Sequence, residues 1–383
     1  MKLYEYQAKE IFKAAGIPVP HELLVDLNMA SEDSSGAGFP ASVFHSEGFA
    51  GIGFPCVIKA QVLQGGRGKA GLVKVAKSSE EAAGILTDYK GRGIEKITLC
   101  EFVEHVQELY LSVTVDPVSG KALIMGCAEG GVEIETLAET NPEAIIRETV
   151  DVRGKLSPFQ ARDTAFRLYE PAGKALAGLI SKLYGIFRNK DAELVEINPL
   201  FITPDGSLVA GDGKLSIDDN STFRQESYIP GQDYYDSDAE YESALEGIPY
   251  LQFDGDISLM CAGAGLTTTV YDLINYEGGS VANYLEFGGP NYRKAKRAME
   301  LCLKNDSKVI LIVTFGTIAR ADVMAEGVVE AIKALNPDRP IVTCIRGTNE
   351  EGAVETLKAA GLEPIFDTEE AVKRAIELCR GAK

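Results

Sequence analysis

The stretch KAQVLQGGRGKAG, residues 59–71, decides how the first half of the chain is interpreted. The apolar run Cys56–Ala60 that leads into it predicts a β-strand, and glycines at positions 65, 66, 68 and 71 predict a loop. Glycine lets the backbone approach a ligand closely, so N–H groups can turn toward a phosphate. Lys59, Arg67 and Lys69 add positive charge. We predict a phosphate-binding loop, although the P-loop signature is absent. The alternative interpretation is a basic surface hairpin turn.

A second cluster combines residues 193–200, which read ELVEINPL, with Asp212. Alternation places Glu196 and Asn198 on one face of a strand. Asp212 is expected at the end of the next strand, after a hairpin-length connection, so adjacent strands would bring the three side chains together. Mg²⁺ prefers hard oxygen ligands of this kind. The cluster predicts a magnesium site, and the alternative is an exposed hairpin that carries two carboxylates.

The last third of the chain alternates strand-like and helical patterns. Helical patterns at 293–304 and 321–335 separate apolar runs, and this alternation predicts a doubly wound parallel sheet of flavodoxin-like size. Such sheets bind ligands at the carboxyl ends of their strands. The predicted strands are 257–261, 280–284, 309–313, 340–345 and 364–366.

Three glycine-containing turns in this region have the same placement, each after a strand and before a helix. They are residues 261–267, 315–322 and 346–350. Free N–H groups at the start of a helix hold anions such as phosphate or carboxylate, so the three turns predict a site at one sheet edge. The alternative is ordinary tight packing between strand and helix.

Composition excludes several classes of function. The formal net charge is −19, whereas nucleic acid binding requires a basic surface, so we expect no nucleic acid partner. Only three histidines occur, which leaves little room for a Ser-His-Asp triad or a zinc site, and the seven cysteines are scattered without a CxxC. Neither a long apolar run nor a signal-peptide core is present. We expect no membrane association and a cytoplasmic location, or an organelle matrix after removal of a transit segment.

Several long motifs resemble the β subunit of succinyl-CoA synthetase, and the resemblance covers nearly the whole chain. These motifs are LYEYQAK (3–9), QGGRGKAG (64–71), EGGVEIE (129–135), EINPL (196–200) and DGK (212–214). The resemblance implies a fold of α/β and α+β class, an ATP-grasp fold followed by a flavodoxin-like doubly wound CoA-ligase domain. Residues 226–246 are acidic and aromatic, which is typical of a linker. The expected division is an ATP-grasp domain at 1–228, a linker at 229–250 and a ligase domain at 251–383.

The resemblance also implies residue roles in the first domain. Nucleotide phosphates would be held by Lys59, Gly66, Arg67 and Gly68. Base and ribose would be read by Glu101, and Glu108 would be the second acidic contact to the nucleotide. Because the family spaces these two acids one residue further apart, the part of Glu104 in nucleotide binding is open. Asn198 and Asp212 would hold Mg²⁺, and Glu196 would face the phosphorylated group.

In this family the phosphorylated histidine and the main CoA site belong to an α subunit, so the chain is expected to be inactive alone. The acid would bind near Ala262, Thr317, Ile318 and Ala319. The family has asparagine where Ala262 stands, and this difference, with Pro290-Asn291, resembles ATP-citrate lyase and citryl-CoA synthetase. The expected activity is a succinate–CoA ligase of the tricarboxylic acid cycle.

Several alternatives stay open at this point. The acid could be malate or citrate in place of succinate. A protein of another class, a nucleotide-sensing assembly subunit without turnover, would fit the same loop. The choice between ATP/ADP and GTP/GDP, the assembly as αβ or (αβ)₂, and the role of the insertion at 27–53 are likewise open.

Overall fold

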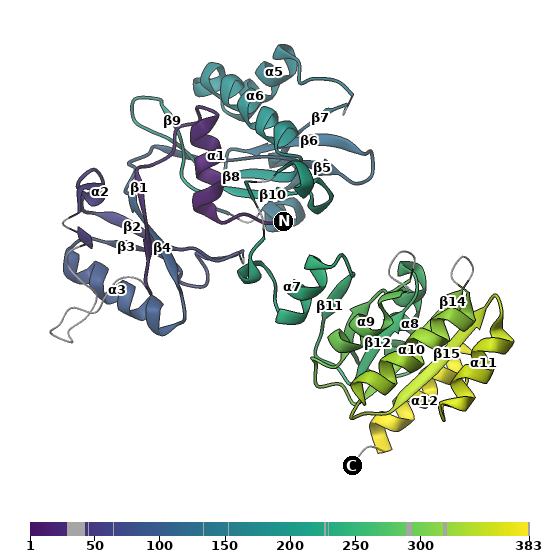
Figure 1. Ribbon diagram of the computed structural model, residues 1–383. Helices are drawn as coiled ribbons and strands as arrows, with labels where there is room; N and C mark the ends of the chain where they lie inside the picture. Colours follow the sequence, from purple (N-terminus) through teal and green to yellow (C-terminus); the bar gives the residue numbers. More distant parts are fainter. Residues whose placement is uncertain are drawn as a thin grey trace. The chain divides into compact units, whose positions relative to one another are not determined.

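The computed structural model describes residues 1–28, 43–44, 46–63, 65–132, 134–151, 153–225, 227–228, 230–288, 293–316 and 320–381. The chain separates into two compact units, Met1–Ile229 and Pro230–Lys383 (Figure 1). Thr317, Ile318 and Ala319, which were expected to contact the acid, lie outside the described residues.

A four-stranded antiparallel sheet forms one half of the first unit, in the order β1-β4-β2-β3. Cys56, Ile58 and Ala60 are buried in the core that the sheet shares with helix α3. The neighbouring position, Lys59, lines a pocket on the other face. The elements are β1 (Glu22–Asp26), α2 (Glu47–Ala50), β2 (Cys56–Ala60), β3 (Val73–Ala76), α3 (Ser79–Gly91) and β4 (Lys96–Glu101).

A six-stranded antiparallel sheet forms the other half, in the order β10-β8-β5-β6-β7, with β9 paired to β8. Helices α1, α5 and α6 share its large apolar core. Figure 1 shows α1, α5 and α6 close to this sheet. The elements are α1 (Glu5–Ala14), β5 (Gln107–Asp116), β6 (Lys121–Cys127), α4 (Ile134–Thr140), β7 (Ile146–Val150), α5 (Pro158–Leu168), α6 (Gly173–Asn189), β8 (Ala192–Ile202), β9 (Leu208–Ala210) and β10 (Lys214–Ile217).

Two features of this half differ from the sequence prediction. The sequence pattern over about 158–187 predicts one long helix, but the helix is broken at Glu170–Ala172, because Pro171 cannot donate a backbone hydrogen bond and its ring blocks helix continuation. The sequence pattern predicts a strand over 208–212, but β9 ends at Ala210 and Asp212 lies in the link to β10. Lys214 then pairs directly with Glu196 of β8, so the link returns the chain alongside the predicted metal cluster.

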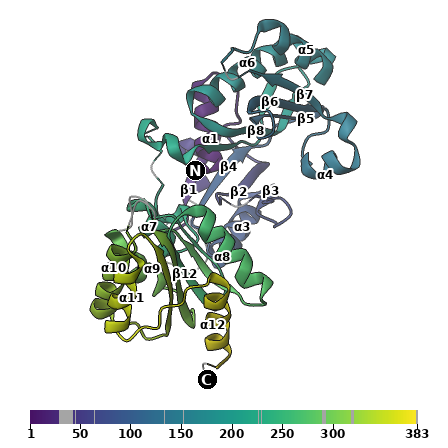
Figure 2. The same cartoon turned by 90° about the vertical axis from the view of Figure 1, so that its right-hand side faces the viewer.

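The second unit is a five-stranded sheet in the order β11-β13-β12-β14-β15, parallel except for its edge strand β11. Figure 2 shows α9, α10 and α11 on one face and α8 and α12 on the other, and a separate apolar core lies on each face. The elements are α7 (Asp238–Leu245), β11 (Tyr250–Gln252), β12 (Ile257–Cys261), α8 (Ala264–Tyr276), β13 (Val281–Leu285), α9 (Ala295–Cys302), β14 (Val309–Gly316), α10 (Ala321–Leu335), β15 (Ile341–Gly347), α11 (Glu350–Ala359) and α12 (Thr368–Gly381).

The predicted doubly wound sheet is therefore confirmed, with one strand exchanged. Residues 364–366 do not form a strand, since Pro364 makes only an isolated bridge to Thr343 and proline lacks the ladder donor. The fifth strand is β11. Segment 229–250, expected as a linker, contains α7, whose Ala239 packs into a core of this unit. Within the described residues, no helix has both the length and the apolar composition that a bilayer span requires.

Candidate functional site

A pocket with a volume of about 1170 Å³ lies between the two sheets of the first unit. One side is formed by β2, the glycine-rich loop and the end of β4, and the other by β5, β8 and the segment Gly211–Lys214. Every residue predicted to bind nucleotide phosphate or metal lines it, as do Glu101 and Glu196, whereas Glu104 and Glu108 do not. Two clusters far apart in the sequence thus share one pocket.

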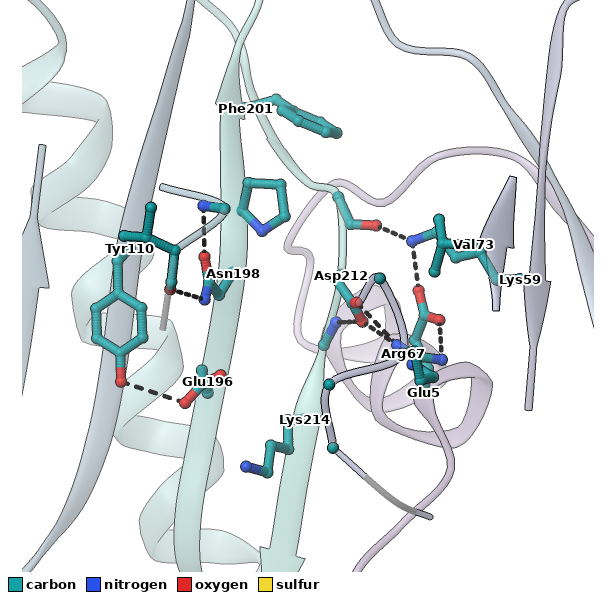
Figure 3. Close-up of a pocket in the computed structure, with 18 of the residues that line it drawn as sticks. Glu5, Lys59, Arg67, Val73, Tyr110, Glu196, Asn198, Phe201, Asp212 and Lys214 are labelled. Carbon is teal, nitrogen blue, oxygen red and sulfur yellow. Dashed lines mark hydrogen bonds and ion pairs between the residues drawn. The ribbon is translucent and has the colours of Figure 1, made fainter. Parts of the chain in front are cut away.

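The positive side of the pocket is built by Lys59 and Arg67 (Figure 3). Lys59 Nζ donates to Glu5 Oε1 and to the backbone oxygen of Gly211, at 2.7 Å each. Arg67 Nη1 donates to Glu5 Oε2 at 2.6 Å, and Nη2 reaches both carboxylate oxygens of Asp212 at 2.8 Å. Burial opposes the charge of Arg67, but the Glu5 and Asp212 carboxylates raise the pKa of its guanidinium.

Glu5 is a residue that sequence reasoning missed at this site. It opens α1 and is only 4% exposed. An acidic residue in the first turn of a helix complements the helix dipole, so the sequence offers no signal that separates this carboxylate from an ordinary one.

The predicted metal ligands face the pocket but are engaged with protein groups. Asp212 pairs with Arg67 and also accepts a hydrogen bond from the Gly213 backbone N–H at 2.7 Å. Asn198 Oδ1 accepts from the Gly131 N–H at 2.8 Å, while its Nδ2 donates to the Val132 oxygen at 2.9 Å. Asn198 thereby holds part of the EGGVEIE motif against β8.

The donor chemistry fits Mg²⁺, because a carboxylate and an amide oxygen are hard ligands that leave room for phosphate and water. Within the described part of the chain, no group of three or more His, Cys, Asp or Glu residues could hold a metal by itself. A metal here would therefore need phosphate oxygens or water to complete its coordination.

Glu196 lies beside these ligands and contacts the hydroxyl of Tyr110. Tyr110 Oη donates to Glu196 Oε2 at 3.2 Å, and also lies 2.9 Å from Ser112 Oγ. Burial raises the pKa of the Glu196 carboxyl, although Lys214 and the Tyr110 hydrogen bond act in the opposite direction. Tyr110, only 1% exposed, is a second residue that the sequence analysis did not single out.

Away from Lys59, the pocket is lined by Glu101 at the end of β4 and by the aromatic rings of His105 and Phe201. Glu101 Oε2 accepts from the backbone N–H of His21 at 3.1 Å, which ties β4 to the segment before β1. The rings of His105 and Phe201 stack with centroids 4.3 Å apart, and His105 Nε2 lies 2.9 Å from Glu108 Oε1. The stacked rings form a flat wall that could receive a nucleotide base, and Glu108 reaches the pocket through His105.

The turns predicted in the second unit do open helices. Ala262 lies in the turn between β12 and α8, where Gly263 has a φ of 98° that favours glycine. A Cβ added to Gly288 would come within 2.9 Å of the Ala262 Cα, so the chain after β13 passes directly against this turn. Ala262 is thus placed at the carboxyl end of β12, while its expected partners at 317–319 lie outside the described residues.

A lysine and a glycine-rich loop on one antiparallel sheet, facing oxygen ligands on another, define a nucleotide-binding domain of the ATP-grasp class. Residues 2–202 match the family described as ATP-grasp domain, and residues 260–378 match the family described as CoA-ligase. The chain belongs to the family of ADP-forming acid–CoA ligase subunits, because it matches such subunits over 93% to 100% of their own length.

The ADP-forming sulfoacetate–CoA ligase subunit SqwK of Acholeplasma sp is 56% identical over 387 residues, which cover 100% of this chain and 93% of that protein. Subunit SauC of the same type of ligase from Bilophila wadsworthia is 56% identical over 385 residues, covering 100% of both. The succinate–CoA ligase subunit beta of Aquifex aeolicus is 38% identical over 395 residues and 99% of each chain.

A solved structure of ATP citrate lyase from Methanothrix soehngenii, in complex with citrate and coenzyme A, shares the fold. Its TM-score is 0.70 at 19% identity, over 98% of this chain and 99% of that one. The predicted order of ATP-grasp and CoA-ligase domains is confirmed, as is membership among acid–CoA ligase subunits. Succinate as the particular acid is not supported, since the sulfoacetate–CoA ligase subunits are much more similar.

Proposed function

We propose that this chain is the nucleotide-binding subunit of a two-subunit ligase that joins sulfoacetate to CoA while Mg-ATP is converted to ADP and phosphate. The observation that carries the proposal is 56% identity over the whole chain to two sulfoacetate–CoA ligase subunits, against 38% to a succinate–CoA ligase subunit. Sulfoacetate and succinate each present a carboxylate for activation and a second anionic group. They differ in that group, because a sulfonate is tetrahedral and a carboxylate is planar.

The residues of the first unit would bind and orient the nucleotide. Lys59 and the N–H groups of Gly66–Gly68 offset the charge of its phosphates, and Arg67 adds a planar guanidinium suited to phosphate oxygens. The stacked rings of His105 and Phe201 receive the base, and Glu101 at the end of β4 contacts the base or ribose. The geometry that supports this assignment is the convergence of these groups on one pocket.

Asn198 and Asp212 would hold Mg²⁺, and the ion would supply positive charge that offsets the charge of the nucleotide phosphates. For this, a carboxylate oxygen of Asp212 would turn from Arg67 toward the metal, and Asn198 Oδ1 would turn from the Gly131 N–H. Both changes replace a contact within the protein by one to the bound complex.

Glu196 would face the group that receives the phosphoryl, a histidine on the partner α subunit. Its burial and the Tyr110 hydrogen bond keep the carboxylate in one orientation, so it can accept the N–H of the imidazole and leave the opposite ring nitrogen to attack. The absence of a histidine from the phosphate-binding end of the described pocket supports a relay through a partner. His105 lies at the base end and pairs with Glu108.

The second unit would contribute to the acid site. Ala262 stands where the succinate-specific family carries asparagine, and a methyl group in place of an amide leaves room beside the turn into α8. This supports an acid head group other than succinate's carboxylate at that turn.

The experiment is an assay of the purified complex with its α partner. CoA thioester formation is measured with sulfoacetate, succinate, malate and citrate, each with Mg-ATP and with Mg-GTP. We expect sulfoacetate to exceed the other acids by roughly 100-fold in kcat/KM, which corresponds to loss of a well-matched charged contact in the wrong acid. Equal or better turnover of succinate would overturn the choice of acid. A complex that binds Mg-ATP but never phosphorylates its partner would overturn the ligase activity.

A further inference from the structure

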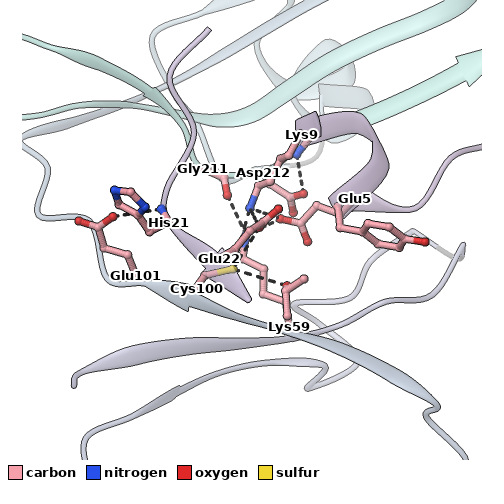
Figure 4. Close-up of polar contacts among 12 residues, drawn as sticks. Glu5, Lys9, His21, Glu22, Lys59, Cys100, Glu101, Gly211 and Asp212 are labelled. Carbon is pink, nitrogen blue, oxygen red and sulfur yellow. Dashed lines mark hydrogen bonds and ion pairs between the residues drawn. The ribbon is translucent and has the colours of Figure 1, made fainter. Parts of the chain in front are cut away.

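Glu5 lies at the centre of a buried charge cluster beside the phosphate-binding side of the pocket. Its Oε1 accepts from Lys59 Nζ at 2.7 Å and pairs with Lys9 Nζ at 2.8 Å, while its Oε2 accepts from Arg67 Nη1 at 2.6 Å. The Glu5 side chain is 2% exposed and that of Lys9 is 1% exposed. Water therefore competes little with the contacts of Glu5 to Lys9 and Lys59 (Figure 4) and to Arg67 (Figure 3).

This carboxylate joins two parts of the first unit. Helix α1 packs into the core of the six-stranded sheet through Ala8, Ile11 and Phe12. Lys59, in contrast, belongs to β2 of the four-stranded sheet, and Arg67 to the loop that follows it. A single side chain on one half therefore contacts both cations of the other half.

The chemistry of the pocket gives Glu5 no direct contact with a nucleotide. A carboxylate repels phosphate, so it has no place as a phosphate ligand. Burial disfavours its charge, but Lys59, Lys9 and Arg67 hold the pKa of the Glu5 carboxyl well below its usual range. The group is thus an anion at working pH, and its effect on a ligand must pass through the cations it holds.

We propose that Glu5 is a positioning residue that holds Lys59 and Arg67 at the separation the nucleotide phosphates require, an inference that rests on the proposed function of this pocket. Its role is greatest once Asp212 has left Arg67 for the metal. Arg67 then keeps Nη1 on Glu5, and Nη2 becomes available to a phosphate oxygen. Without Glu5, Arg67 would lose both of its carboxylate partners at that moment.

Glu22 provides a matched control. It is also a carboxylate that pairs with Lys9, at 2.9 Å, and its side chain is 16% exposed. It does not line the pocket and contacts neither Lys59 nor Arg67 through any described hydrogen bond or ion pair. Glu22→Gln therefore removes a comparable ion pair of the same cluster without touching the two cations.

The test compares Glu5→Gln and Glu22→Gln in the complex with the α partner. We expect Glu5→Gln to weaken Mg-ADP binding, measured by calorimetry, by roughly tenfold or more, and Glu22→Gln by less than about twofold. The KM values for CoA and the acid should not change. Melting temperatures of both variants report the structural contribution separately. Equal effects of the two variants on Mg-ADP affinity, or an unchanged affinity in Glu5→Gln, would overturn the proposal.

Two further variants decide the matter if Glu5→Gln does not fold. Glu5→Asp keeps the charge but shortens the side chain, so we expect a higher KM for Mg-ATP with other KM values unchanged, and wild-type behaviour would count against the proposal. In an Arg67→Met background, Glu5→Asp should raise the KM for Mg-ATP by a smaller factor than in wild type, because the arginine through which Glu5 acts is already missing. If wild type binds Mg-ADP but makes no thioester, the proposed ligase activity is wrong, whereas the proposed role of Glu5 in nucleotide binding still stands.

Discussion

Arg67 and Asp212 form a two-pronged ion pair in which Nη2 of the arginine lies 2.8 Å from both carboxylate oxygens of the aspartate. The two side chains come from opposite walls of the pocket, and both are mostly buried, with exposed fractions of 12% and 27%. Each is also the group best suited to one half of a metal–nucleotide complex, the arginine to phosphate and the aspartate to metal. In the nucleotide-free protein, Arg67 and Asp212 therefore neutralise each other's charge. Binding of a metal–nucleotide complex would separate the two side chains.

Replacing Asp212 by alanine should abolish phosphorylation of the partner subunit. The carboxylate is the only charged member of the proposed metal ligand pair, so we expect the labelling rate with radioactive Mg-ATP to fall below about 1% of wild type. The control is Asp163→Ala, which removes a carboxylate of a surface ion pair on α5 at 3.3 Å from Arg167. Normal labelling in Asp212→Ala would refute the metal assignment.

Replacing Arg67 by methionine should change metal and nucleotide affinity in opposite directions. Asp212 loses its competing partner, so Mn²⁺ alone should bind the nucleotide-free complex roughly threefold tighter or more, while Mg-ADP binds more weakly. Metal binding is measured by electron paramagnetic resonance. Lys214→Met serves as the comparison, because it removes another pocket cation that pairs across the sheet with Glu196. An equal gain in Mn²⁺ affinity there would indicate a general charge effect in place of competition for Asp212.

Asp191 should make a pH-dependent contribution to the stability of the first unit. The hydrogen bonds from Arg224 lower the pKa of its carboxyl to about 2, from the ordinary 3.8. A lowered folded-state pKa adds stability that is present above pH 3.8 and is lost as the pH falls through about 2. Since the Arg224 side chain is 53% exposed, solvent screens the ion pair and keeps its contribution to stability small.

The measurement is urea unfolding of wild type and Asp191→Asn between pH 7 and the acid limit of folding. We expect the variant to be less stable at neutral pH, with the difference shrinking below about pH 4. Asp163→Asn, at the more exposed pair with Arg167, should show little difference at any pH. A constant gap across the whole range would exclude the ion pair as its source.

The sequence predicted the pocket residues whose identity reflects local pattern. Alternation along one strand placed Glu196 and Asn198 together, and the glycine spacing located the loop that carries Arg67. Each of these depends on neighbours within a few positions, which the chain displays directly. Asp212 was expected in the same place, although it lies in a link and not at a strand end.

Glu5 and Tyr110 could not be found in this way, because their roles arise from contacts across the fold. Glu5 and Lys59 are 54 positions apart, and Tyr110 and Glu196 are 86 apart. An acid at a helix start and a tyrosine in an apolar strand have ordinary local explanations. Pro171 alone predicts the break between α5 and α6, but the helical spacing of apolar residues continues on both sides of it and favours a single helix.

Replacing Tyr110 by phenylalanine should slow phosphoryl transfer without unfolding the chain. The change removes the hydrogen bond at 3.2 Å to Glu196 and the contact at 2.9 Å to Ser112, and leaves the ring in the core. Glu196 then loses the contact that orients it, so we expect the rate of partner phosphorylation to fall by roughly tenfold while the affinity for Mg-ADP stays within about twofold.

Tyr184→Phe is the matched control, because the hydroxyl of Tyr184 is buried and has no hydrogen-bond partner among the described residues. Loss of that hydroxyl should leave phosphorylation unchanged and keep or slightly raise the melting temperature, since an unsatisfied polar group is removed from the core. If Tyr110→Phe phosphorylates its partner as fast as wild type, then Tyr110 does not orient Glu196, and Lys214, the neighbour of Glu196 on β10, is the remaining candidate.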